Sequence, residues 1–392
     1  MKILVICQYY YPEPFRISDI CEGLAERGHD VTVVTGVPNY PEGIIYKGYE
    51  GGENRYEVIG GVNVYRCNTI PRKTGAFYRI LNYYSYPRSS TKLINKLNID
   101  FDVVFIYQLS PIMMAKAGIE YAKSHQKPCI LYCLDLWPKS LVAGGLRENS
   151  IIYKHYHKVS ASIYNSVDKI LITSQSFSDY FVNEFGIDKS KIEYLPQYAE
   201  EIFENVSQKE PGAVFDFVFA GNIGTAQSVI TIVKAAEILI DEPVRFHIVG
   251  SGIELQNLQK YADEHKLKNV TFYGRRPLEE MPEFYSMADA MLLTLKSDPV
   301  LSMTLPGKIQ SYMAAGKPII AAINGEAEKV MKESNCGFCG SAENAIELAC
   351  NIRLFIKHKD VLSFVENSRA YYEKHFNKES FMCELEKALN TR

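Results

Sequence analysis

The sequence predicts an α/β protein with two domains, each built on a mainly parallel sheet. Short apolar strands alternate with amphipathic helices, the alternation pauses once at residues 197–213, and it then restarts. A length of 392 residues suits two or three domains of ordinary size. The composition, 47% hydrophobic and 23% charged, excludes a disordered or collagen-like chain.

The first half opens with an apolar strand at residues 2–8, followed by a Pro-rich loop and a helix that Ser18 begins. That helix ends at Arg27-Gly28, and a second strand occupies residues 30–35. Further strands are predicted at residues 62–66, 103–107, 128–133 and 169–173, with helices at residues 112–124 and 153–167. Strands separated by helices imply right-handed crossovers, so the sheet should be parallel.

The second half repeats this pattern after an acidic linker that contains Pro and Gly. Strands are predicted at residues 216–220, 244–249, 270–273, 290–295 and 318–321, and helices at residues 228–240, 254–264, 281–287, 308–314 and 378–389. We therefore expect two Rossmann-like domains, residues 1–198 and 199–375. Ligands of such folds bind at the carboxyl ends of the strands, so the facing edges should form a cleft.

The first strand-to-helix turn argues against a dinucleotide or P-loop site. No Gly occurs between Met1 and Gly23, and no Walker A motif is present. In the second half, Gly221-Asn-Ile-Gly224-Thr-Ala-Gln-Ser228 follows a strand and precedes a helix. Such a loop can bring backbone N–H groups close to a diphosphate, although a plain tight turn has the same pattern.

Other loops with small or basic residues fall on the same predicted edge. They are Gly250-Ser-Gly252, Gly274-Arg275-Arg276-Pro277 and residues 297–308 (SDPVLSMTLPGK). The last ends in Lys308 at the start of a helix, where the helix dipole disfavours a cation. A bound phosphate would explain that cation; a solvated surface lysine is the alternative.

Asp135-Leu-Trp137-Pro138 holds the single Trp and follows a strand of the first half. The acid could orient a sugar hydroxyl while the indole packs on the sugar's apolar face. A helix N-cap and a core Trp are the alternative interpretation. No HExxH, DxD or similar cluster occurs, so we expect no bound metal.

Charge is distributed unevenly. Residues 58–99 contain seven Lys or Arg and no Asp or Glu, although the whole chain carries a formal charge of −3. Basic and aromatic residues alternate there and suit an anionic bilayer surface: Arg72, Lys73, Phe77, Tyr78, Arg79, Tyr83, Tyr84 and Arg88. A segment that is merely solvated remains an alternative interpretation. Binding to nucleic acid is disfavoured because the rest of the chain is acidic.

The sequence gives no sign of membrane insertion or secretion. No apolar run approaches the roughly 18–20 residues of a membrane span, and residues 1–8 are a strand pattern rather than a signal peptide. We therefore expect a cytoplasmic protein with reduced cysteines.

Several motifs resemble one known family. They are MKILVICQYYYPEP at the start, RGHDVTVVTGVPNYPEG (27–43), DLWPKS (135–140), YLPQYAEEIF (194–203), FAGNIGTAQS (219–228) and PGKIQSYMAAGKPIIA (306–321). Together they resemble the GT-B, family-four retaining glycosyltransferases. The similarity is closest to the branch in O-antigen and capsule loci that includes N-acetyl-L-fucosamine transferases.

This resemblance implies a reaction and its partners. The donor would be a nucleotide sugar, a UDP-linked N-acetylated deoxysugar, held by the C-terminal half without metal or cofactor. The acceptor would be a polyprenyl-diphosphate-linked glycan on the N-terminal half, at the inner face of the cytoplasmic membrane. The helical residues 376–392 would pack back towards the N-terminal domain.

The resemblance also assigns roles to residues. The Asn222-Ile223-Gly224 loop would meet the diphosphate, and Arg275 and Arg276 would lie near the nucleobase. The family's E-x7-E element falls on the segment from Ser302 to Gln310, which includes Pro306 and Gly307.

The sequence departs from the family pattern at the charged positions. The two glutamates are replaced by Ser302 and Gln310, and the Arg/Lys pair of the broader family's phosphate loop by Asn222 and Gln227. Gln310 can still bind ribose hydroxyls. Lys308 and Arg16 are expected to supply the missing cations.

We expect transfer with retention, in which Lys308 and helix-terminal N–H groups stabilise the leaving diphosphate. Asp135 and Glu13 are candidates for orienting donor or acceptor hydroxyls. Two alternatives remain: a non-catalytic nucleotide-sugar or glycan-binding subunit, because the glutamates are missing, and a hydrolysing UDP-sugar 2-epimerase, which shares the two-domain architecture.

Overall fold

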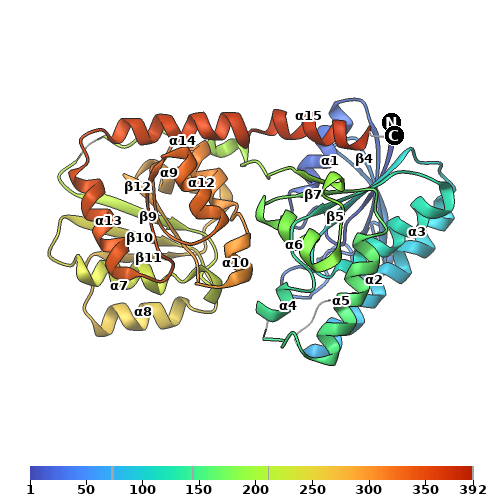
Figure 1. Cartoon of the computed structure of the whole chain (residues 1–392), viewed down its shortest axis with the longest axis horizontal. Helices are drawn as coiled ribbons and strands as arrows, with labels where there is room; N and C mark the ends of the chain where they lie inside the picture. Colours follow the sequence, from blue (N-terminus) through green and yellow to red (C-terminus); the bar gives the residue numbers. More distant parts are fainter. Residues whose placement is uncertain (72–74, 144, 211, 391–392) are drawn as a thin grey trace. The chain divides into compact units, whose positions relative to one another are not determined.

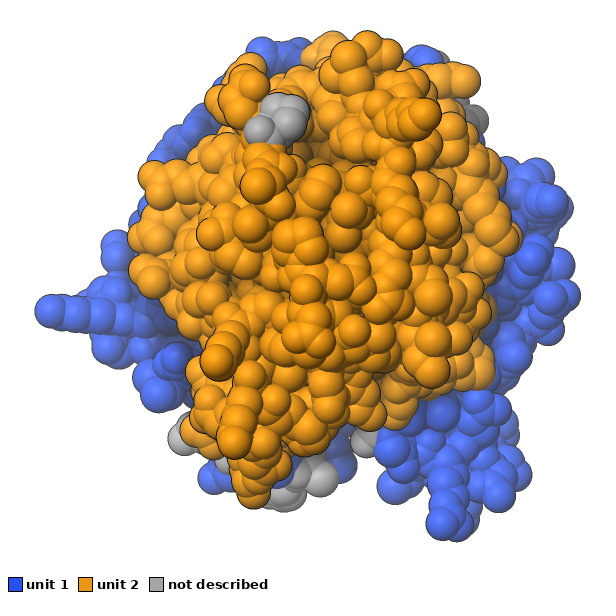
Figure 2. Space-filling view, turned by 90° about the vertical axis from the view of Figure 1, so that its left-hand side faces the viewer, with its two compact units in different colours: residues 1–195, 382–392 blue, residues 196–381 orange. Residues whose placement is uncertain are grey.

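A computed structural model describes residues 1–71, 75–143, 145–210 and 212–390. The chain divides into two compact units, coloured separately in Figure 2. Unit 1 consists of Met1–Leu195 with Met382–Arg392, and unit 2 of Pro196–Phe381. Each is an α/β unit on a mostly parallel sheet, as predicted (Figure 1). These divisions lie after Leu195 and Phe381, whereas the expected boundaries lie after residues 198 and 375.

Unit 1 contains an eight-stranded sheet in the order β3-β4-β2-β1-β5-β6-β7-β8. All neighbouring strands are parallel except β3, which runs antiparallel to β4. The central strands are apolar and buried on both faces because helices cover both sides of the sheet. The strands are β1 (Lys2–Ile6), β2 (Asp30–Gly36), β3 (Tyr56–Ile59), β4 (Val62–Cys67), β5 (Val103–Gln108), β6 (Cys129–Cys133), β7 (Lys169–Ile172) and β8 (Ile192–Tyr194).

The helices of unit 1 include three that the sequence did not predict, α2, α4 and α6. The full set is α1 (Ile17–Glu26), α2 (Ala76–Leu97), α3 (Lys116–His125), α4 (Ser140–Ala143), α5 (Ile151–Tyr164) and α6 (Ser176–Phe185). Helix α2 lies in the basic, aromatic segment, and its buried residues include Asn82, Tyr86 and Ser90 rather than a row of aliphatic side chains. The Tyr86 hydroxyl donates to the carbonyls of Cys7 (2.9 Å) and Val34 (2.8 Å), which ties α2 to the sheet.

The C-terminal helix α15 (Lys378–Leu389) contributes residues to both units. Within unit 1 it packs on α1, where a Cβ on Gly23 would lie 3.0 Å from Met382 Cε. Glu386 accepts from Arg27 (2.9 Å) and pairs with His29 (2.8 Å). These contacts join the last helix to the first within unit 1.

Unit 2 contains a six-stranded parallel sheet in the order β11-β10-β9-β12-β13-β14. Its strands are β9 (Phe215–Ala220), β10 (Val244–Val249), β11 (Val270–Gly274), β12 (Ala290–Thr294), β13 (Ile319–Ala322) and β14 (Gly337–Gly340). Its helices are α7 (Ile230–Ile238), α8 (Leu255–Glu264), α9 (Met281–Ser286), α10 (Pro299–Met303), α11 (Lys308–Ala314), α12 (Glu326–Ser334), α13 (Ala345–Lys357) and α14 (Val361–His375).

Alternation along β9 explains why unit 2 has a core on each face of its sheet. Phe217 and Phe219 point into one apolar cluster, whereas Val218 and Ala220 point into the other. Strands β3, β8 and β14 were not predicted because they are only three or four residues long and incompletely buried.

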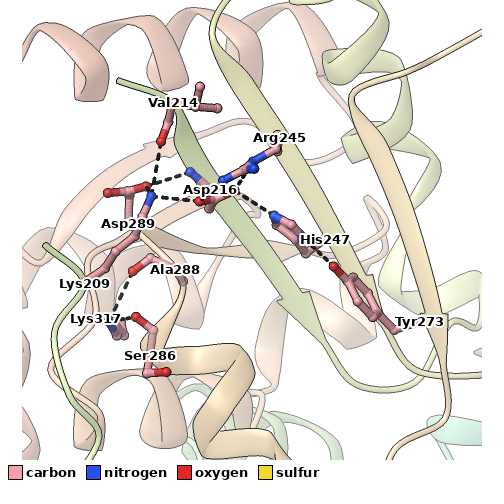
Figure 3. A network of polar contacts seen from close by, with 10 residues as sticks. All are labelled: Lys209, Val214, Asp216, Arg245, His247, Tyr273, Ser286, Ala288, Asp289 and Lys317. Carbon is pink, nitrogen blue, oxygen red and sulfur yellow. Dashed lines mark hydrogen bonds and ion pairs between the residues drawn. The ribbon is translucent and has the colours of Figure 1, made fainter. Parts of the chain in front are cut away.

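A charged network stabilises the amino end of the second sheet (Figure 3). The buried Asp216 carboxylate accepts from Arg245 Nε (2.6 Å) and Nη2 (2.8 Å), from Lys209 (2.8 Å) and from His247 Nε2 (2.8 Å). Burial alone would raise its pKa, but these hydrogen bonds hold the pKa of Asp216 well below its usual range. The carboxylate therefore stays ionised and joins the linker residue Lys209 to β9 and β10.

Candidate functional site

The topology of unit 2 indicates where a ligand would bind. Strands β9 and β12 are neighbours, and the strand order reverses between them. At such a switch point the loops leave in opposite directions and open a crevice at the carboxyl ends of the strands. The Thr294 hydroxyl donates to the Gln227 carbonyl (2.7 Å) and the Lys296 amide to the Ala226 carbonyl (2.9 Å), so the two loops are held together.

Glycines bring the neighbouring loop of β10 against the loop of β9. Gly250 has a φ of +146°, and a Cβ there would lie 1.8 Å from the carbonyl oxygen of Gly221. A Cβ on Gly252 would lie 2.2 Å from the Ile223 carbonyl oxygen, and the Ile223 amide donates to Ser251 (2.9 Å). Only glycine permits this backbone contact, which fixes the shape of the Gly221–Gly224 turn.

Lys308 reaches the same turn from the first position of α11. Its Nζ lies 3.7 Å from the centroid of the Phe219 ring, and a Cβ on Gly221 would lie 2.8 Å from Nζ. Lys308 Nζ is buried and has no hydrogen-bond partner among the residues that the structure describes. Burial lowers the pKa of Lys308 to about 7.

A buried amine without a partner is costly, and the cost falls when an anion binds beside it. The solvated alternative for Lys308 is therefore wrong. The carboxyl edge at β9 and β12 is a candidate anion site, with Lys308 as its cation beside the Gly221–Gly224 turn.

The Gly224 amide is used differently from the expectation. It donates to Gln227 Oε1 (3.2 Å), which also accepts from Asn222 Nδ2 (3.1 Å). Ile223 is buried in the core of unit 2. Gln227 thus closes the turn from within, and the Gly224 N–H is not directed at a ligand in this structure.

The segment that replaces the E-x7-E element is engaged with its own backbone. Ser302 Oγ donates to the Asp298 carbonyl (2.9 Å). Gln310 is buried, and in the amide orientation that satisfies both ends it donates to the carbonyls of Pro306 (3.0 Å) and Gly307 (3.2 Å). Gln310 thus fixes the turn that places Lys308, and its contact with ribose hydroxyls stays a prediction.

Arg275 and Arg276 are exposed beyond β11, two strands away from β9 on the same carboxyl edge. Arg276 Nε donates to the Tyr273 carbonyl (3.2 Å), and its guanidinium lies 3.7 Å from Glu280. Arg276 is therefore engaged with its own loop, and the contact of either arginine with a nucleobase stays a prediction.

In unit 1, Asp135 and Trp137 have different environments. The Ser110 hydroxyl donates to Asp135, whose side chain is half-buried where β5 and β6 end. Trp137 is buried and forms edge contacts with Tyr83 (5.5 Å between ring centroids) and Tyr156 (5.6 Å). The core interpretation of Trp137 is therefore correct, and a role for Asp135 in orienting a sugar stays a prediction.

Glu13 is buried beside the carboxyl ends of β1 and β2. Its carboxylate accepts from the amides of Asn39 (2.8 Å), Tyr40 (2.7 Å) and Tyr10 (3.3 Å). Burial raises the pKa of Glu13 to about 7, and these N–H groups oppose the rise. Its contacts make Glu13 a positioning residue for two loops; Arg16, just before α1, is half-buried in the same unit.

The expected membrane-facing residues belong largely to α2. Tyr78, Arg79, Tyr84 and Arg88 are exposed, whereas Tyr83 is buried and its expected surface position is wrong. Phe77 lies in the first turn of α2, and Arg72 and Lys73 lie outside the described residues.

The described part of the chain contains neither a candidate membrane span nor a candidate metal site. No helix there has the length and apolarity of a membrane span, and no three His, Cys, Asp or Glu side chains are arranged to hold a metal ion.

Two family models match consecutive parts of the chain. Residues 16–197 match Glycosyltransferase Family 4, and residues 200–374 match Glycosyl transferases group 1. The curated putative colanic acid biosynthesis glycosyl transferase WcaI of Escherichia coli K12 is 26% identical, over 97% of this chain and 98% of its own.

Solved structures share the fold at low identity. Sucrose-phosphate synthase from Thermosynechococcus elongatus superposes with a TM-score of 0.76, at 15% identity and over 99% of this chain and 98% of its own. Anabaena HepE in complex with UDP has a TM-score of 0.75, at 15% identity and over 99% of both chains.

Proposed function

We propose that this chain, a glycosyltransferase of the GT-B fold, moves a sugar from a nucleotide diphosphate to a lipid-linked glycan with retention. The donor would be a UDP-linked N-acetylated deoxysugar, and the acceptor a polyprenyl-diphosphate-linked glycan of O-antigen or capsule biosynthesis. The observation that carries the proposal is the buried Lys308 amine beside the Gly221 turn, which has no hydrogen-bond partner among the described residues.

The comparisons support the donor and the pathway class. WcaI is named for colanic acid biosynthesis, and HepE was solved with UDP. The switch point of unit 2 would hold the diphosphate, and Arg275 and Arg276 would meet the nucleobase farther along the edge. The N-acetyl-L-fucosamine branch remains a prediction from the sequence motifs.

The chemistry follows from the charge that develops. The bond from the anomeric carbon to the diphosphate breaks, a bond to the acceptor oxygen forms on the same face, and the acceptor proton passes to the leaving phosphate oxygen. Lys308, protonated when the anion binds, would stabilise the departing dianion. Asp135 would orient a sugar hydroxyl. Glu13 would hold in place the two loops that follow β1 and β2. The proposal includes neither metal nor cofactor, because Lys308 supplies the positive charge.

A lipid-linked acceptor would place the enzyme at the inner face of the cytoplasmic membrane as a peripheral protein. The support is the exposed basic and aromatic face of α2, which suits anionic lipid.

Incubation of the purified chain with labelled UDP-sugars and extracted polyprenyl-linked glycans tests the proposal. We expect one donor to transfer its sugar only when acceptor is present, and NMR coupling constants should give the donor's anomeric configuration in the product. UDP binding without transfer to any acceptor would instead indicate a binding subunit. Acceptor-independent UDP release with an altered sugar would indicate a 2-epimerase.

A further inference from the structure

Two helices of unit 1 begin with exposed apolar side chains. Ile151 and Ile152 open α5 and are 87% and 57% exposed. Tyr78 and Ile80, in the first turns of α2, are also exposed. We call these four residues the apolar tip. Water-exposed isoleucine at consecutive positions contributes nothing to the fold, so the set suggests a contact with something else.

The two helix starts lie at the same end of unit 1. Helix α2 follows β4 and α5 follows the loop after β6, and these strands belong to the parallel part of one sheet. Both helices therefore start at the carboxyl edge. Tyr83 of α2 and Tyr156 of α5 touch edge to face, with ring centroids 6.3 Å apart, within two turns of each start. Figure 1 shows the two helices side by side.

The charge on the two helices has one sign, whereas Glu148, three residues before α5, is acidic and pairs with Lys139. Helices α2 and α5 together contain six Lys or Arg and no Asp or Glu: Arg79, Arg88, Lys92, Lys96, Lys154 and Lys158. All six are exposed. Each basic group near an anionic membrane surface strengthens binding, and apolar side chains add affinity that salt does not screen.

We infer that the apolar tip inserts into the interfacial layer of an anionic bilayer, with the basic faces of α2 and α5 against the lipid headgroups. A bilayer fits better than a protein groove because exposed isoleucine and amphipathic tyrosine occur together at the starts of two helices whose charged residues are all basic. The inference deepens the proposed function and rests on it, since a lipid-linked acceptor requires the enzyme to work at a membrane.

Vesicle flotation tests the inference with a matched control. The variant Ile151→Ser/Ile152→Ser removes apolar surface and leaves every charge in place. The control Ile346→Ser/Leu362→Ser changes two residues of unit 2 that are 70% and 64% exposed at the starts of α13 and α14. Vesicles of phosphatidylcholine with phosphatidylglycerol are used at two salt concentrations, about 0.05 M and about 0.5 M. The higher concentration screens the attraction between surface charges more strongly.

We expect the wild type and the control to bind at low salt and to keep measurable binding at high salt. The Ile151→Ser/Ile152→Ser variant should bind at least tenfold more weakly at either salt concentration. In a separate variant, Ile151→Trp, fluorescence should shift to the blue when vesicles are added, against the constant signal of the buried Trp137.

Equal binding by the serine variant and the wild type would overturn the inference, as would an unshifted Trp spectrum in vesicle-bound protein. Binding only to protein-containing membranes, and not to pure lipid, would overturn it in favour of a protein partner. Transfer to a detergent-dispersed acceptor should persist in the serine variant. If the wild type transfers sugar but does not bind vesicles, the membrane inference alone is contradicted. If the wild type does not transfer sugar to any acceptor, the proposed function is contradicted.

Discussion

Replacing Lys308 by Ala should lower kcat about 100- to 1000-fold, the range for removing one group that stabilises a developing anion. The reason is local: the Lys308 amine lies beside Gly221, at the switch point, without a hydrogen-bond partner among the described residues. Steady-state kinetics with the identified donor and acceptor measure the effect. The exposed Lys268, in the loop before β11, provides the control, and Lys268→Ala should leave kcat unchanged.

A second variant separates catalysis from folding. Lys308→Met keeps the length of the side chain and its contact with Phe219 but removes the charge. Because burial lowers the Lys308 pKa from 10.5 to about 7, the amine must give up its proton when the free protein folds, and this cost grows as the pH falls from 10.5 to 7. Lys308→Met should therefore stabilise the ligand-free protein, by on the order of 3 kcal/mol at pH 7, while kcat falls. A variant that is both destabilised and inactive would contradict this account.

Replacing Asp216 by Asn should destabilise the protein by about 3 kcal/mol, because Lys209, Arg245 and His247 lose their common anionic partner. Urea unfolding followed by circular dichroism measures the loss. The effect should be confined to stability: Asp216 lies at the amino end of β9, whereas the candidate site lies at the carboxyl end.

The lowered pKa of Asp216 also predicts how the stability of the protein changes with pH. The pKa of Asp216 is lowered in the folded protein, so its contribution is complete above the unfolded value of about 3.9 and is lost as the pH falls towards the folded value. The wild type should lose stability in that acid range more steeply than Asp216→Asn. Asp241→Asn, an exposed carboxyl before β10, should resemble the wild type. Equal acid slopes for all three proteins would show that Asp216 is not the linked group.

Much of the fold could be predicted because its strands are apolar runs separated by helices. Strand β10 and helices α11 and α15 have the predicted bounds. Helix α2 was missed for a physical reason: its buried side chains include Asn82, Tyr86 and Ser90, which hydrogen-bond to neighbours instead of forming an aliphatic row. Periodicity of apolar residues cannot find such a helix.

The site was predictable in outline but not in its contacts. The sequence placed the Gly221 turn and Lys308 on one predicted edge, and the structure brings the Lys308 amine against Gly221. It could not reveal that Gln227 closes the turn around the Gly224 amide, or that Gln310 bonds its own helix start. Those hydrogen bonds depend on side-chain geometry, which residue types alone do not determine. Trp137 and Tyr83 show the same limit, since an aromatic residue fits a core or a surface equally well until its neighbours are known.

The central claim is that the Lys308 amine holds the pyrophosphate of the donor. The direct measurement is an NMR titration of the lysine ammonium groups, with Lys308 assigned by its absence from Lys308→Arg spectra, in the free protein and with UDP. We predict a pKa of about 7 in the free protein and a clear rise when UDP is bound, because the dianion favours the protonated amine. A Lys308 pKa that UDP binding leaves unchanged would contradict the claim.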